Sequence, residues 1–194
     1  MLGTSSGAYD ATIRHVLQLL RPQSVLELGC GQGKFGGLLR ETLGEIGNLR
    51  AVQKIFTPGD REALRSLGYR DVVDRDILEH FREGFDEHYD LVVALDVIEH
   101  FLISDIWSIV HFALYRADYM LLVWPSAHPQ SAVTSAFDRH RSSFELSDLA
   151  SRFDVVFYAQ TGFAQVHFQH RYHIALLRGF MNAKVLPPVL AGAA

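Results

Sequence analysis

The sequence predicts an α/β fold in which a doubly wound, mostly parallel sheet has helices on both of its faces. Short apolar runs of strand length alternate with segments of helical periodicity, and a glycine-rich turn directly follows the first of these runs. This alternation implies right-handed βαβ units and a parallel sheet. The last two β-rich segments have no helix between them, so we expect an antiparallel hairpin at one edge.

Length and composition are those of an ordinary globular domain. The 194 residues carry 18 Lys and Arg against 22 Asp and Glu, which gives a net charge of −4, and 48% of them are hydrophobic. A domain of this size buries about 70% of its unfolded surface and needs no covalent staple. Its single cysteine, Cys30, excludes an internal disulfide framework. We expect one domain over residues 1–183 and a flexible tail over 184–194.

The same composition restricts location and partners. The sequence begins without a basic and apolar leader, and no uninterrupted apolar stretch approaches about 18 residues, so neither secretion nor membrane spanning is expected. We place the protein in the cytoplasm. The net negative charge argues against extended electrostatic binding of nucleic acid, so a small molecule is the expected partner. Whether the protein forms a homodimer is left open.

The first half of the chain gives four helices and three strands. Apolar residues at helical spacing predict a first helix over 9–20, which ends before Pro22. Thr57 and Pro58 supply an N-cap and a first helical residue for a later helix, and Gly68 ends it. The predicted strands are 24–28, 51–56 and 71–74, and the predicted helices that follow them are 35–43, 58–67 and 77–85.

The second half begins with a strand over 89–95 that is apolar enough to be buried on both faces. A helical stripe over 106–114 and a strand over 119–124, closed by Pro125, complete the parallel part. A short helix over 145–151 then precedes the two strands of the expected hairpin, 154–159 and 170–177.

The turn after the first strand has the glycines of a nucleotide-binding loop. Gly29, Gly31 and Gly33 follow the acid Glu27, and such a turn lets the backbone approach a ligand at the carboxyl edge of the sheet. Residues Gly31–Gly36 also satisfy the dinucleotide fingerprint, so an NADP-dependent oxidoreductase is one alternative. Glu27 inside the strand and the late start of that fingerprint count against it.

With three such motifs the chain resembles the class I S-adenosylmethionine-dependent methyltransferases. Residues 25–33 are similar to the first motif of that family, 74–77 to the acidic turn after its third strand, and 89–100 to its fourth-strand motif. The resemblance covers most of the chain. It implies a seven-stranded sheet in the order 3-2-1-4-5-7-6, S-adenosylmethionine as cofactor, and methyl transfer to an oxygen or nitrogen of a small molecule.

The resemblance also assigns cofactor-binding residues. Glu27 helps to organise the methionyl region, the glycine backbone passes close to the cofactor, and the end of the fourth strand meets it. Asp76 is similar to the residue that bonds the adenine amino group, and Ile77 to the one that packs on the ring. The assigned residues are Glu27, Gly29, Cys30, Gly31, Gly33, Lys54, Asp76, Ile77, Asp96 and Val97.

Lys54 departs from the family pattern, because it stands where an acid usually takes both ribose hydroxyls. An ammonium group has only donors and cannot accept the ribose protons. Binding is then weakened or lost, or an acid such as Asp60 substitutes, or Lys54 meets a phosphate. We expect a retained cofactor site. The alternative is a binding or regulatory subunit of the same fold with impaired cofactor binding.

His100 and His140 are the candidate catalytic residues. Methyl transfer needs positioning, and it needs a base only where the acceptor must lose a proton. His100 follows Glu99 at the end of the fourth strand, and His140 lies in the segment that covers the acceptor pocket of similar enzymes. The first helix and the segment 126–144 are expected to cover the site. A structural role for His100, bracing its loop, remains an equal interpretation.

A metal site at this position is considered but not assigned. Asp96, Glu99, His100 and His140 are similar to the metal-binding set of the small-RNA 3′-terminal 2′-O-methyltransferases, which makes a metal-dependent RNA methyltransferase a further alternative. The positive charge and the additional RNA-binding domain expected of such an enzyme are not evident. We predict no metal ligands.

Overall fold

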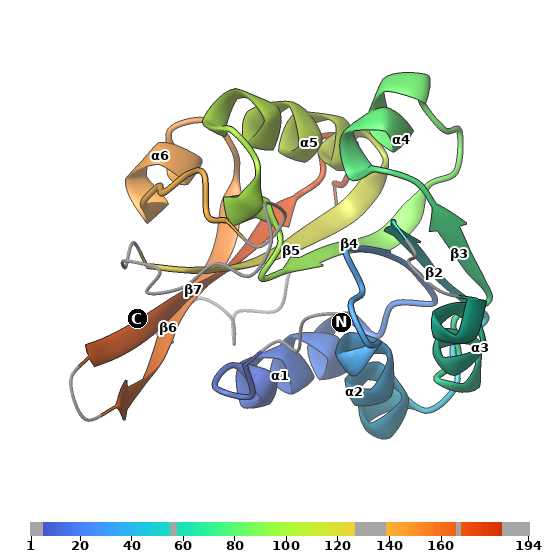
Figure 1. The fold of residues 1–194 in the computed structure, drawn as a ribbon. Coiled ribbons are helices and arrows are strands. Elements are labelled where there is room, and N and C mark those ends of the chain that lie inside the picture. The colour runs from blue at the N-terminus through green and yellow to red at the C-terminus, as the bar shows by residue number, and fades with distance from the viewer. Residues whose placement is uncertain (1–5, 55–57, 127–138, 166–167, 184–194) are drawn as a thin grey trace.

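The computed structural model describes residues 6–54, 58–126, 139–165 and 168–183. A seven-stranded sheet has the order β3-β2-β1-β4-β5-β7-β6, as the sequence predicts (Figure 1). Strands β1 to β5 are parallel to one another, and β7 is antiparallel to both β5 and β6. The strands are β1 (Ser24–Leu28), β2 (Asn48–Gln53), β3 (Asp71–Asp74), β4 (Tyr89–Leu95), β5 (Ala117–Pro125), β6 (Val155–Gln165) and β7 (Phe168–Arg178).

Helices cover both faces of this sheet (Figure 1). Buried residues of α1, α2 and α3 share one apolar cluster, and those of α4, α5 and α6 share the other. Within the described ranges, none of the helices is long and apolar enough to cross a lipid bilayer. The helices are α1 (Asp10–Leu20), α2 (Lys34–Leu43), α3 (Pro58–Ser66), α4 (Ile77–Glu83), the 3₁₀ turn η1 (Ile98–His100), α5 (Ile103–Tyr115) and α6 (Leu146–Ala150).

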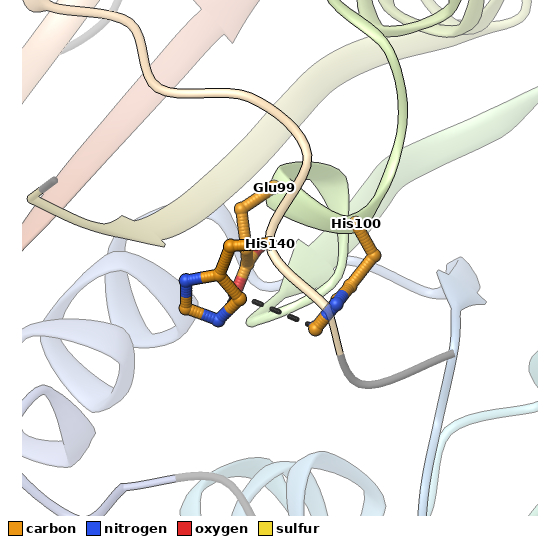
Figure 2. Close-up of side chains that lie close together, drawn as sticks. All are labelled: Glu99, His100 and His140. Carbon is orange, nitrogen blue, oxygen red and sulfur yellow. Dashed lines mark ion pairs between the residues drawn. The ribbon is translucent and has the colours of Figure 1, made fainter. Parts of the chain in front are cut away.

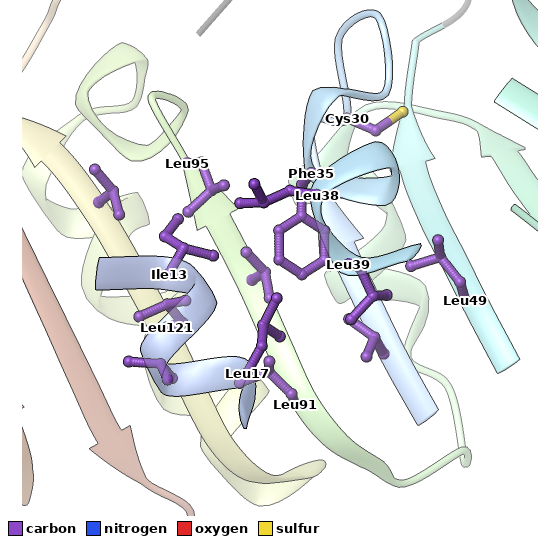
Figure 3. Packing of buried hydrophobic residues seen from close by; sticks show 14 of the residues in the cluster. Ile13, Leu17, Cys30, Phe35, Leu38, Leu39, Leu49, Leu91, Leu95 and Leu121 are labelled. Carbon is purple, nitrogen blue, oxygen red and sulfur yellow. The ribbon is translucent and has the colours of Figure 1, made fainter. Parts of the chain in front are cut away.

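Strand β4 lies at the centre of both clusters, which confirms that it is buried on both faces. Leu91 packs with Ile13 and Leu17 of α1 on one face (Figure 3). Val92, its neighbour in sequence, packs with Ile109 of α5 on the other, because successive side chains of a strand point to opposite faces. The apolar run that predicts the strand therefore also fixes the positions of α1 and α5.

The strand predictions for β2 and for the two hairpin strands are wrong in their bounds. β2 begins at Asn48 rather than at 51, because Asn48 pairs with β1 and Arg50 with β3, and the Arg50 guanidinium forms an ion pair with Glu87. Residues 55–57, with the expected cap Thr57, lie outside the described residues, as does the predicted tail 184–194. The hairpin strands run longer than predicted, since backbone pairing with β7 continues through polar residues of β6.

Candidate functional site

The candidate site lies at the carboxyl ends of β1 and β4, where the strand order of the sheet reverses. From β1 the chain proceeds outward to β2 and β3, and from β4 it proceeds the other way to β5 (Figure 1). The loops after the two central strands therefore lead to helices on opposite faces. In open α/β sheets a ligand binds in the crevice at this point.

The turn after β1 depends on its glycines. Gly29, Gly31 and Gly33 all have positive φ angles, of 70°, 53° and 81°. A Cβ atom on Gly29 would lie 2.6 Å from Cγ2 of Val97, so this glycine lets the β1 turn lie directly against the loop after β4. The predicted cofactor residues Gly29 and Val97 are thus neighbours in space.

Gln53, the last residue of β2, holds this turn in place. Its side-chain oxygen accepts hydrogen bonds from the backbone N–H of Gly31 and from the Cys30 thiol, the latter at 3.4 Å, and its amide nitrogen donates to the Gly31 carbonyl at 3.4 Å. Lys54, the next residue, is exposed beyond the end of the strand. Sequence reasoning missed Gln53; the available signal was a side chain with both donor and acceptor at the end of a buried strand.

Glu27 lies beneath the same turn, and one oxygen of its carboxyl group accepts a hydrogen bond from the protein. The hydroxyl of Tyr69 donates to Oε2 of Glu27 and accepts the backbone N–H of Gly36 at 3.1 Å. Burial raises the pKa of Glu27 to about 8, against the opposing effect of the Tyr69 hydrogen bond. Through Tyr69, two residues before β3, the acid therefore connects β1 to the start of α2. Burial also raises the pKa of the Cys30 thiol, which makes it a packing group rather than a nucleophile.

Asp76 and Ile77 follow β3, two strands away from β1 along the same edge. Asp76 caps α4, with its Oδ1 accepting the backbone N–H of Leu78 at 2.8 Å. Ile77 is buried in the cluster beneath the sheet. The predicted cofactor residues thus follow β3, β1 and β4, at the carboxyl edge where parallel strands all end.

Asp96 ends β4 in a left-handed conformation, with φ of 54°. Such a conformation is uncommon outside glycine and, where it is kept, points to a functional constraint. The hydroxyl of Tyr9 donates to Oδ2 at 2.7 Å, whereas Oδ1 is buried without a hydrogen-bond partner. Burial raises the pKa of Asp96, and the Tyr9 hydrogen bond partly offsets this.

The N-terminal segment covers this edge, as expected for the first helix. Lys34 of α2 holds this segment through three contacts of its ammonium group. The group donates to the Ser6 carbonyl, forms an ion pair with Asp10 at 2.6 Å and lies 4.7 Å from the centre of the Tyr9 ring. On the other side, the hydroxyl of Thr161 in β6 donates to the Ala8 carbonyl at 2.9 Å. Of the other expected cover, the segment 126–144, residues 127–138 lie outside the described residues.

Glu99, His100 and His140 come together at one place (Figure 2). Glu99 is 3% exposed, and its Oε1 lies 3.8 Å from Nε2 of His100 and 3.9 Å from Nε2 of His140, while its Oε2 has no hydrogen-bond partner. The pKa of Glu99 is held well above its usual value, first by burial and then by the negative charge of Asp96. The two imidazole rings are 5.1 Å apart.

Backbone contacts fix the segment that carries His140 against η1. The carbonyl of Glu99 accepts the backbone N–H groups of Arg141 and Ser142 at 2.8 and 3.2 Å. Nδ1 of His100 faces the carbonyl oxygen of Arg139 at 3.3 Å. The two candidate catalytic histidines, which lie far apart in the sequence, are therefore held at one site.

Comparison with known proteins supports the fold. Neither a protein-family model nor a curated protein matches the sequence. Among solved structures, the methyltransferase domain of bacterial CtHen1 is 16% identical, with a TM-score of 0.60 over 88% of this chain and 97% of that chain. TehB from Haemophilus influenzae is 17% identical, with a TM-score of 0.62 over 89% and 63%.

A third similar structure carries a ligand. The N-methyltransferase NodS from Bradyrhizobium japonicum, in complex with S-adenosyl-L-homocysteine, is 17% identical, with a TM-score of 0.60 over 90% of each chain. At these identities the likeness concerns the fold alone. The chain has the class I methyltransferase fold, which confirms the fold that the sequence predicts.

Proposed function

We propose that this protein is an S-adenosylmethionine-dependent methyltransferase that acts on an oxygen or nitrogen atom of a small molecule. The observation that carries the proposal is the contact between two loops at the switch point of the sheet. The glycine turn after β1 lies against Val97, beside a β4 edge that carries Asp96, Glu99 and the two histidines. A nucleoside cradle and a set of acid–base groups thus share one edge.

The residues at this edge fit the cofactor. Three glycines with positive φ angles leave the backbone of the turn open to close approach, and Asp96 has a buried oxygen without a hydrogen-bond partner, which an ammonium or hydroxyl group would satisfy. When bound, S-adenosylmethionine supplies an electrophilic methyl group. The fold neighbour NodS is known with S-adenosylhomocysteine bound, which supports this choice of ligand.

We assign the ribose contact to Gln53 in addition to Lys54. The Gln53 oxygen already accepts from Gly31 and from the Cys30 thiol, and its amide nitrogen donates one proton to the Gly31 carbonyl, which leaves its second amide proton for a ribose oxygen. Gln53 therefore adds a donor at the turn, next to the donors of the exposed Lys54 ammonium. On this view Lys54 does not abolish cofactor binding, and a subunit that has lost its cofactor is not favoured.

His100 and His140 are assigned to the acceptor. Both imidazoles are partly exposed and lie next to the buried carboxylate of Glu99. An acceptor that loses a proton on methylation needs a base within hydrogen-bond reach, and an imidazole is suited to this near neutral pH. The carbonyl of Arg139 orients the His100 ring for this role.

Isothermal titration calorimetry with S-adenosylhomocysteine tests the proposal. We expect micromolar binding to the unmodified protein and no binding of NADPH. Gln53→Ala should weaken binding about tenfold, the loss of one hydrogen-bonded contact, whereas the matched neighbour Lys54→Ala should change it by less than about threefold. Binding of NADPH in place of S-adenosylhomocysteine would identify an oxidoreductase, and binding of neither ligand would contradict a methyltransferase.

A further inference from the structure

The outward face of α5 differs from that of the helix beside it. α5 lies on the outside of the sheet, with α4 on one side and α6 on the other (Figure 1). Within α5, which the structure describes in full, the exposed positions hold no Asp, Glu, Lys or Arg; they are Ile103, Ser104, Ser108, His111 and Tyr115. α4, by contrast, exposes Glu79, Arg82 and Glu83. Because a helix at the surface normally carries charged side chains on its outward face, this face of α5 is suited to contact with another surface.

Exposed apolar side chains gather at the two ends of this face. At one end, Leu102 and Ile103 are exposed at the start of the helix. At the other end, the exposed Tyr115 is joined by Phe180 and Met181, which follow β7. These residues are all of the exposed large hydrophobic side chains in the described ranges. Such clustering, unlike scattered exposure, marks an interaction site.

The apolar group at the end of α5 is held in place by its own contacts. The Phe180 ring centre lies 4.8 Å from that of Tyr115 and 5.0 Å from that of His111. The backbone N–H of Phe180 donates to the carbonyl of Leu114 at 2.9 Å. A surface that is already ordered loses little conformational freedom when a partner binds it.

The spacing of the outermost positions of α5 is symmetric. Steps of four, three and four residues separate positions 104, 108, 111 and 115, which share one side of the helix. When two such helices pack antiparallel about a two-fold axis, Ser104 of one copy meets Tyr115 of the other, and Ser108 meets His111. Each large side chain then faces a small one. From this symmetry we propose that α5 is the interface of a homodimer, in which two copies of the chain pack their α5 helices antiparallel.

The ends of the helix also match in this arrangement. The face runs from Ile103 to Tyr115, about 18 Å at a rise of about 1.5 Å per residue. An antiparallel pair places the apolar start of one helix against Tyr115 and Phe180 of the second copy. At the rim, Asp105 and Arg116 lie about three turns apart on one side of the helix. Each carboxylate therefore approaches a guanidinium of the other copy, which favours the antiparallel orientation.

The proposed interface reaches the candidate site. Leu102 and Ile103 follow η1, which carries Glu99 and His100. The second copy packs on the residues that join η1 to α5, so association stabilises the loop that holds these two side chains. Association depends on the surface of α5 and not on the proposed function.

Sedimentation velocity of the full chain tests the dimer. One helix face and one turn form a smaller contact than a standard protein interface, so we expect reversible association in the micromolar range. The unmodified protein should sediment as a monomer when dilute and as a species of twice that mass when concentrated. No cofactor is needed, so the result does not depend on whether the protein binds S-adenosylhomocysteine.

A charge at the centre of the face should prevent association. Ser108→Glu places a carboxylate beside the two-fold axis, where the same group of the second copy faces it. We expect the dissociation constant to rise at least about a hundredfold, since like charges across an interface oppose binding. Ser66→Glu is the matched control, because Ser66 of α3 is also an exposed helical serine whose hydroxyl donates to a carbonyl of the preceding turn. This variant should dimerise as the unmodified protein does.

A mixture of two variants tests the two-fold arrangement itself. Ser108→Glu and Ser108→Lys should each remain monomeric alone and associate when mixed in equal amounts, since opposite charges then face each other across the axis. Circular dichroism of each variant separates loss of association from loss of the fold. A monomer at every concentration of the unmodified protein, a dimer that persists in Ser108→Glu, or a mixture that stays monomeric would each overturn the α5 dimer.

Discussion

The loops after β1 and β4 lie against each other, yet their polar groups are satisfied in different ways. After β1, the Gln53 amide bonds to Gly31, and the Tyr69 hydroxyl bonds to Glu27. After β4, Asp96 and Glu99 each retain a buried carboxylate oxygen without a hydrogen-bond partner. The buried polar groups of the β1 loop are thus hydrogen-bonded within the protein, whereas two carboxylate oxygens of the β4 loop are not.

This difference indicates that the β1 loop has a structural role and that the β4 loop is the reactive part of the site. A satisfied network of buried hydrogen bonds rigidifies the backbone that it holds, whereas an unsatisfied buried oxygen costs free energy that a ligand can recover. The β1 turn therefore provides a fixed backbone surface for a cofactor. The β4 edge is where a bound ligand gains the most, because it can satisfy these oxygens. Substitutions in the two loops should accordingly change stability in opposite directions.

The largest expected effect is the pH dependence contributed by Glu27. Its pKa is raised to about 8 in the folded protein, so the carboxyl stays protonated there while it ionises in the unfolded chain. The stability that it contributes is fully present below about pH 4.5 and is lost as the pH rises toward 8, by up to about 1.4 kcal/mol per pH unit. Urea unfolding of the unmodified protein and of Glu27→Gln across this range should diverge accordingly; parallel curves would show that Glu27 is ionised in the fold.

Removing the Tyr69 hydroxyl should give the next largest effect. Tyr69→Phe keeps the buried ring but leaves Glu27 and the Gly36 N–H without their shared partner. We expect the free energy of unfolding to fall by about 1–3 kcal/mol. Tyr115→Phe changes an exposed tyrosine and serves as the control, with a change below about 0.5 kcal/mol. If both variants changed the free energy of unfolding equally, the Tyr69 hydroxyl would not be what stabilises the β1 turn.

Gln53→Leu should lower the free energy of unfolding by about 1–2 kcal/mol, because Gly31 loses its side-chain partner. Lys54→Ala, at the neighbouring exposed position, should change it by less than about 0.5 kcal/mol. Chemical denaturation of both variants gives the two free energies of unfolding. A larger decrease in Lys54→Ala than in Gln53→Leu would show that Lys54, not Gln53, stabilises the turn.

Glu99→Gln is expected to have the smallest effect and the opposite sign. The amide removes a buried carboxyl that must stay protonated in the fold, beside Asp96, while it ionises in the unfolded chain. At neutral pH we expect an increase in the free energy of unfolding of about 1 kcal/mol. Thermal unfolding checks this. A clear loss of stability would show that Glu99 is satisfied within the protein and would remove the contrast with the β1 loop.

Most of the fold could be predicted from the sequence because its signals are local. The periodicity of residues 106–114 gives the buried face of α5, and the apolar run 89–95 gives β4 with its bounds. The start of β2 was wrong because Asn48 and Arg50 carry no strand signal of their own. They become strand residues through pairing with β1 and β3, which only the folded chain supplies.

The candidate site was predictable in its residues but not in its contacts. The motifs place Glu27, Asp96 and His100 at the ends of strands, where the structure has them. The partner of Glu27 is Tyr69, and the neighbour of His100 is His140; both come from distant segments without a sequence signal for these pairings. Tertiary packing thus decides that one acid braces a turn while another faces two imidazoles.

A crystal structure of the protein grown with S-adenosylhomocysteine tests the central claim most directly, because it places the ligand relative to both loops. We predict that the ligand lies on the backbone of Gly29–Gly33, with its ribose at Gln53 and its sulfur toward Asp96. Well-ordered crystals without the ligand, or with the ligand away from the β1 and β4 loops, would contradict the account.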